Sequence, residues 1–150
     1  MGLFDKVFGV NRAGAATAAL DGKESVAALM LATVAADGVI TEDELTGFTN
    51  AVNRMSMFRA MGQAGFSKML QKLLGMLKKD GPDGLVGAAV NSVPPDYRET
   101  AFALCADLVM GDGEVDPAEE KLLDQMYKAL GVSEELAHKV IQVMAIKNKV

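Results

Sequence analysis

The sequence contains the same short turn twice, and this repeat constrains the fold more than any other feature. Asp37-Gly38 and Asp112-Gly113 are each followed by an apolar residue two positions after the glycine and by a glutamate six positions after it. The apolar positions before the two turns also coincide at the same offset: Val26, Leu29, Met30 and Val34 fall on Ala101, Leu104, Cys105 and Val109. Matching patterns at a fixed offset indicate an internal repeat, approximately 24–56 and 99–131.

Each copy of the repeat carries the signals of a helix, a tight turn and a second helix. The apolar residues before each turn recur at the i, i+3, i+4 spacing of an amphipathic helix. Thr41 and Asp116 are suited to cap the next helix, and Glu44 and Glu119 stand three positions later, as a capping box requires. Pro117 at the first helical position strengthens the second copy. The sequence therefore predicts two helix, Asp-Gly turn, helix units.

The rest of the chain is also predicted to be helical. An apolar stripe over 66–77 predicts a helix that stops at Asp80-Gly81-Pro82, and shorter helices are expected at 85–93 and near 3–8. A last helix is expected from about Ser133 to Ile146, with two glutamates in its first turn.

Ala, Leu and the ten Met residues are good helix formers, whereas β-branched residues are scattered and never form alternating runs, which favours helix over sheet. We expect an all-α fold of seven to eight helices, with two pseudo-symmetric units in one bundle-like domain over residues 1–150.

Charge and apolar runs limit the function classes. The net charge is −5, and an acidic chain lacks the clustered cations that nucleic-acid binding needs. No apolar run is long enough to span a membrane and no signal peptide is visible, so a cytoplasmic protein is expected. From Glu24 to Asn53 there is no Lys or Arg, whereas Arg54 to Lys79 contains no Asp or Glu. Such segregation predicts one acidic and one basic region, through which a protein partner could bind.

The two aspartates need a physical explanation. Each is expected at the C-terminal end of a helix, where the dipole disfavours negative charge. Each also lies eleven positions after the start of its apolar stripe, which predicts an inward-facing carboxylate. Its partner would be backbone amides, an Arg or Lys, or a cation. Both segments match the second half of a calcium-binding EF-hand loop. A true EF-hand is excluded because Thr33, Ala35, Leu108 and Met110 stand where the first half needs oxygen ligands.

Two interpretations of these acids stay open. In the first, they have only a structural role: the Asp-Gly turns end one helix, and the capping boxes begin the next. In the second, a weak site for a divalent cation, Ca²⁺ or Mg²⁺, joins Asp37 and Glu44 to Asp112 and Glu119 across the pseudo-symmetry.

Other chemistry has little support in the sequence. His138 is the only histidine and Cys105 the only cysteine, and neither belongs to a catalytic motif. We therefore expect a binding module rather than an enzyme. The alternatives are a purely structural adaptor and a hydrolase that uses the paired carboxylates as acid and base.

The two turn segments, 35–44 and 110–119, resemble the repeated A-D-G-x-[IV]-x-x-x-E signature of the tellurite-resistance TerB family. Met1 to Val7 looks similar as well, and the second signature departs only in having Gly111 where alanine is usual. The resemblance implies an all-helical cytoplasmic protein of stress response that works beside membrane-associated and metal-binding partners. It implies a cation site at Asp37, Glu44, Asp112 and Glu119, and no enzyme activity.

Overall fold

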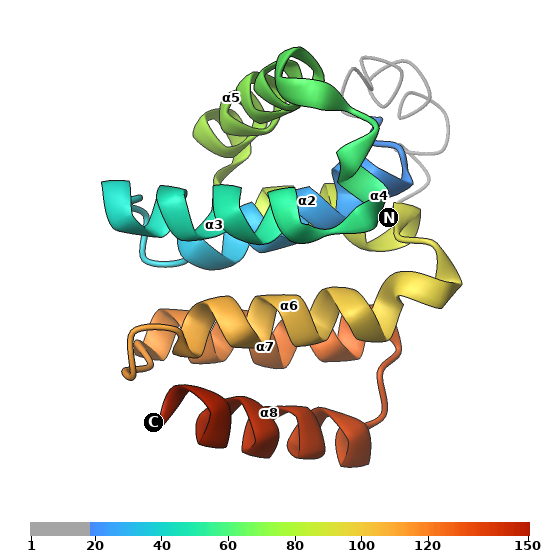
Figure 1. Ribbon diagram of the computed structural model, residues 1–150. Coiled ribbons are helices and arrows are strands. Elements are labelled where there is room, and N and C mark those ends of the chain that lie inside the picture. Colours follow the sequence, from blue (N-terminus) through green and yellow to red (C-terminus); the bar gives the residue numbers. More distant parts are fainter. Residues whose placement is uncertain (1–18) are drawn as a thin grey trace.

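Helix α2 (Gly22–Val34) is the innermost element of the fold. A computed structural model describes residues 19–150, and in this part of the chain the protein has seven α-helices and no strand, as predicted (Figure 1). The helix expected near 3–8 lies outside the described residues. The other helices are α3 (Glu42–Arg54), α4 (Ser56–Arg59), α5 (Gly62–Ala89), α6 (Arg98–Met110), α7 (Pro117–Leu130) and α8 (Glu134–Asn148), with 3-10 turns η1 (Val90–Ser92) and η2 (Pro95–Tyr97).

Helix α2 is buried on every side, which the sequence pattern did not predict. All residues from Ser25 to Ala35 are buried, and the helix contacts α3, α5, α6 and α7. The prediction of an amphipathic stripe with an outward face was therefore wrong for this helix. The reason is composition: its other buried positions carry Ala, Leu, a serine and a threonine rather than charges. The Thr33 hydroxyl donates to the Leu29 carbonyl at 2.7 Å, so no water is needed to satisfy it.

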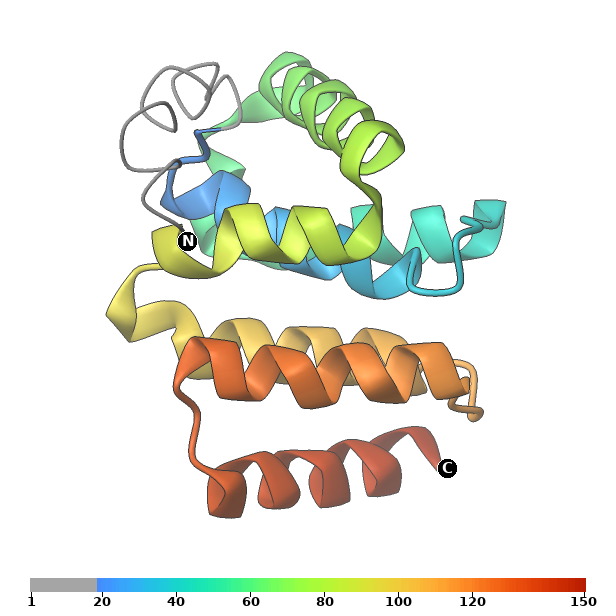
Figure 2. The same cartoon turned by 180° about the vertical axis from the view of Figure 1, so that it is seen from behind.

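Helix α5 is two helices that meet at a sharp break. Gly81 has φ 75° and ψ 176°, which is outside the helical region, and Pro82 follows it. This confirms the stop predicted at Asp80-Gly81-Pro82, because glycine adopts a positive φ without cost and proline cannot continue a helix. Helix α5 packs on α2, and its segment after the break runs alongside α2 before it leads through η1 to the second half of the chain (Figures 1 and 2).

Helices α6, α7 and α8 form the second half of the fold, with α8 at its edge (Figure 1). Phe102 of α6 lies in the core, and its ring meets that of Tyr127 on α7 edge to face, with centroids 6.1 Å apart. The last helix is present close to its predicted bounds, and Ser133 caps it by accepting a hydrogen bond from the Leu136 amide at 3.1 Å. None of the helices within residues 19–150 is both long and apolar enough to cross a bilayer.

Candidate functional site: the acidic end

The two Asp-Gly turns have the same local geometry. Gly38 and Gly113 have φ of 90° and 84°, the left-handed conformation that ends a helix and that glycine adopts most readily. Asp37 accepts a hydrogen bond from the Val39 amide at 3.0 Å, and Asp112 accepts one from the Glu114 amide at 3.0 Å. Each aspartate thus closes its own turn with one carboxylate oxygen, Oδ1.

The prediction that these carboxylates face inward was wrong. Asp37 and Asp112 are both exposed. The last helical residues are Val34 and Met110, so both aspartates lie past the end of the helix. Helical periodicity does not apply there, and each side chain turns back onto the two following residues instead. Because both residues are exposed to solvent, neither carboxylate needs a buried counter-charge.

Both predicted capping boxes are present. In α3, the Thr41 amide donates to Glu44 Oε1 at 2.9 Å and the Glu44 amide donates to Thr41 Oγ1 at 3.1 Å. In α7, the Asp116 amide donates to Glu119 Oε1 at 3.0 Å, and Asp116 caps the first turn. These bonds satisfy backbone amides that a helix N-terminus otherwise leaves without partners.

We expect Glu44→Ala and Glu119→Ala each to lower the free energy of unfolding by ~0.5–2 kcal/mol through loss of the cap. The matched controls are Glu42→Ala in α3 and Glu120→Ala in α7. Both are exposed acids of the same first turns that make no capping bond, so they lose only the favourable dipole interaction. Urea midpoints compare the four variants. Equal shifts for cap and control residues would contradict the capping role.

The four predicted ligands Asp37, Glu44, Asp112 and Glu119, here called the acidic end, belong to turns at the same end of the helix pairs (Figure 1). Burial raises the pKa of Glu119 above its usual value, and the hydrogen bond from the Asp116 backbone opposes this. The negative charges of Asp112, Asp116 and Glu44 also raise the pKa of Glu119. Glu44 belongs to the first repeat, so carboxylates of the two repeats lie close enough to repel each other.

The acidic end is not a closed metal cage. Within residues 19–150, no three His, Cys, Asp or Glu side chains are grouped so that they could hold a metal ion. The hydrogen bonds described above use one oxygen of each carboxylate, Oδ1 of the aspartates and Oε1 of the glutamates. The second oxygens make no hydrogen bond within the described part of the protein. The four acids thus close the turns and cap the helices, and each carboxylate has one oxygen left for another ligand.

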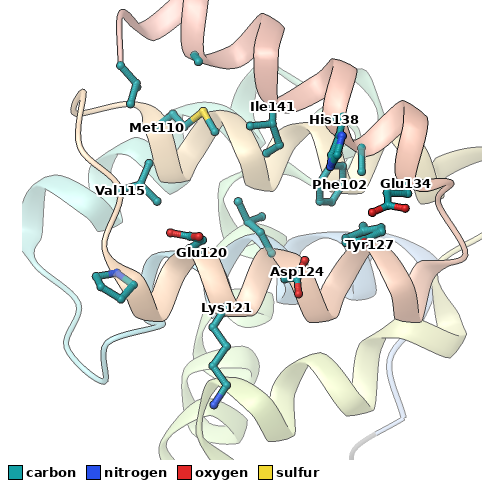
Figure 3. A pocket seen from close by; sticks show the side chains of 15 residues that line it. Phe102, Met110, Val115, Glu120, Lys121, Asp124, Tyr127, Glu134, His138 and Ile141 are labelled. Atoms are coloured by element: carbon teal, nitrogen blue, oxygen red, sulfur yellow. The ribbon is translucent and has the colours of Figure 1, made fainter.

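A second feature, which the sequence analysis missed, is a groove between α7 and α8 (Figure 3). Its volume is about 720 Å³, within the range of ligand-binding clefts. Phe102, Leu123 and Ile141 give it an apolar lining, and the acids Glu120, Asp124 and Glu134 stand around it. No motif marks it, because its walls come from three helices. The only signal in the sequence is that α8 carries apolar residues on more than one of its faces.

Comparison with known proteins gives one match. The family model described as tellurite resistance protein TerB matches residues 23–142, which include both Asp-Gly turns, both capping boxes and most of α8. Comparisons with curated proteins and with solved structures gave no match.

Proposed function

The chain belongs to the TerB family of tellurite resistance proteins, and from this premise we propose a non-enzymatic stress-response module that binds a divalent cation, Ca²⁺ or Mg²⁺, at the acidic end. The observation that supports the proposal is the crowding of acids around Glu119: burial raises the pKa of this carboxyl most, and the negative charges of Asp112, Asp116 and, from the other repeat, Glu44 raise it further. A cation placed between such groups relieves their repulsion. A cytoplasmic location fits this role.

The chemistry of the donors suits a hard cation. Ca²⁺ and Mg²⁺ prefer oxygen ligands, and each of the four carboxylates has an oxygen that caps no backbone amide. Because the described acids do not form a cluster of three, the ion would retain much of its water shell and bind weakly. Asp112 and Glu119 would be its main protein contacts, with Glu44 adding charge from the first repeat.

We expect Ca²⁺ or Mg²⁺ at 100 times its dissociation constant to raise the free energy of unfolding by ~2.7 kcal/mol, since the ion binds the folded state only. The measurement is the melting temperature in chloride salts of the divalent ion, compared with NaCl of equal ionic strength. The rise should vanish in the Asp37→Asn, Asp112→Asn double variant, because asparagine retains the turn-closing oxygen and removes the charge.

A matched control is the Asp83→Asn, Asp96→Asn double variant. It removes the same charge at two exposed positions outside the acidic end and should respond like wild type. An equal response in all three proteins, or none in any, would contradict the cation site and leave the structural adaptor as the function of the turns.

A second candidate function is binding of an acidic protein partner, such as a membrane-associated stress protein. The supporting observation is the basic region, which consists of Arg54, Arg59, Lys68, Lys78 and Lys79. All five side chains are exposed, and none forms an ion pair with another described residue. Lys72 differs, because it pairs with Glu24 at 3.0 Å. The Lys68→Glu, Lys79→Glu double variant should abolish co-purification of such a partner. Lys72→Glu should chiefly lower the stability, because it breaks the ion pair with Glu24.

A further inference from the structure

The groove between α7 and α8 exists because both helices pack mainly on α6. They run antiparallel and pack less closely on each other than either packs on α6 (Figure 1). Phe102 and Met110 of α6 line the space left between them, together with Leu123 of α7 and Ile141 of α8. At about 720 Å³ and with this apolar lining, the groove has the size and the chemistry of a site for a small molecule.

Three carboxylates, here called the groove acids, border this apolar lining. Glu120 and Asp124 come from α7, and Glu134 comes from α8. Glu120 and Glu134 each lie in the first turn of their helix. Because the two helices are antiparallel, these two acids stand toward opposite ends of the groove, with Asp124 between them (Figure 3). A positive charge placed in the groove would therefore lie near a carboxylate at either end and in the middle.

Basic side chains offset the charge of the groove acids only in part. Glu120 and Glu134 form no ion pair with another described residue. Asp124 pairs with Lys128 at 3.4 Å, but both side chains are mostly exposed, so the pair is weak. Lys121 is the one Lys or Arg among the described lining residues, and its ammonium group points away from α8 (Figure 3). The groove therefore combines an apolar lining with an excess of negative charge.

We propose that the groove binds small organic cations that carry an apolar body. The apolar body covers the lining, and the positive charge lies among the groove acids. The rings of Phe102 and Tyr127 also line the groove and add cation–π attraction. Tyr127 already has a cation near its ring, because Lys128 Nζ lies 5.7 Å from the ring centroid. An anion of the same shape gains the same apolar contact but is repelled by the groove acids.

The first test compares a cation and an anion of the same shape in the full chain. Tetraphenylphosphonium and tetraphenylborate are nearly equal in size and carry opposite charges. Each is titrated into isotope-labelled protein, and its dissociation constant is taken from the NMR shifts of groove amides such as those of Leu123 and Ile141. We expect tetraphenylphosphonium to bind there about tenfold or more tightly than tetraphenylborate, because the groove acids attract one ion and repel the other.

Three results of this titration would contradict the proposal. The first is an affinity for tetraphenylborate at the groove that equals or exceeds that for tetraphenylphosphonium. The second is a set of shifts confined to other parts of the protein. The third is a shift of the groove amides on dilution without any ligand, which would place a second copy of the chain in the groove.

The second test removes charge and keeps shape. The Glu120→Gln, Glu134→Gln double variant should weaken tetraphenylphosphonium binding about tenfold, because only Asp124 of the groove acids keeps its charge. The matched control is the Glu42→Gln, Glu99→Gln double variant, which neutralises two exposed first-turn acids outside the groove and should bind like wild type. Circular dichroism checks that both variants are folded. Equal affinities of the two double variants would overturn the proposal.

The groove is a different site from the acidic end, because none of the four carboxylates of the acidic end lines it. The two proposals can therefore fail separately. The Asp37→Asn, Asp112→Asn double variant should lose its response to divalent ions and still bind tetraphenylphosphonium like wild type. Loss of both responses in this variant would show that the groove is not a separate cation site.

Discussion

Leu31→Ala will lower the free energy of unfolding by ~2–5 kcal/mol relative to wild type, which is the usual cost of removing a buried leucine side chain and leaving a cavity. Leu31 is fully buried in the middle of α2. Helix α2 is in contact with four other helices, so the surrounding side chains cannot collapse into the space without moving several of them. Chemical denaturation followed by circular dichroism measures the loss.

This residue also discriminates between two descriptions of α2. The apolar stripe in the sequence runs through Val26, Leu29, Met30 and Val34, and Leu31 is outside it. In an amphipathic helix Leu31 would face solvent, and its truncation would cost less than about 0.5 kcal/mol. Val39→Ala provides that reference value, because Val39 is mostly exposed in the following turn. A Leu31→Ala effect as small as that of Val39→Ala would contradict the buried position of α2.

Cys105 will react with a small thiol reagent at pH 8 at least ~10³-fold more slowly in the folded protein than in the unfolded chain. Burial raises the pKa of its thiol from 9.0 to about 12, although a hydrogen bond with the Thr33 side chain opposes this in part. Three pH units correspond to a ~10³-fold smaller thiolate population, and the thiolate is the reactive form. Full burial of the side chain slows the reaction further.

The labelling rate is best measured with and without denaturant. Without denaturant, the reaction requires opening of the α6 region. Leu31→Ala should label faster than wild type under native conditions, in proportion to its lower stability. Native Cys105 reacting as fast as the unfolded chain would show that the thiol is accessible and would contradict its place in the core.

Local sequence signals predicted well where helices end and how the next helices are capped. The glycines at 38, 81 and 113 adopt positive φ where a stop was expected, and both capping boxes form with the residues expected of them. These features succeed because they depend on a few neighbouring residues and on backbone sterics that do not change with tertiary context.

Features set by tertiary context were predicted less well. The inward orientation expected of Asp37 and Asp112 was wrong, because a helical wheel was extended past the last helical residue. Burial of α2 on every side depends on helices that are distant in sequence, and so does the groove, whose lining comes from α6, α7 and α8. Periodicity within one segment carries no information about how many neighbours the segment will have.

The complete burial of α2 has a consequence for how the chain folds. A repeated sequence suggests two units that could each fold alone, yet α2 comes from the first repeat and packs on α6 and α7 of the second as well as on α5. A fragment ending before α6 would leave one side of this apolar helix in water. Neither repeat is therefore an autonomous folding unit, and the two should unfold in one cooperative transition rather than in sequence.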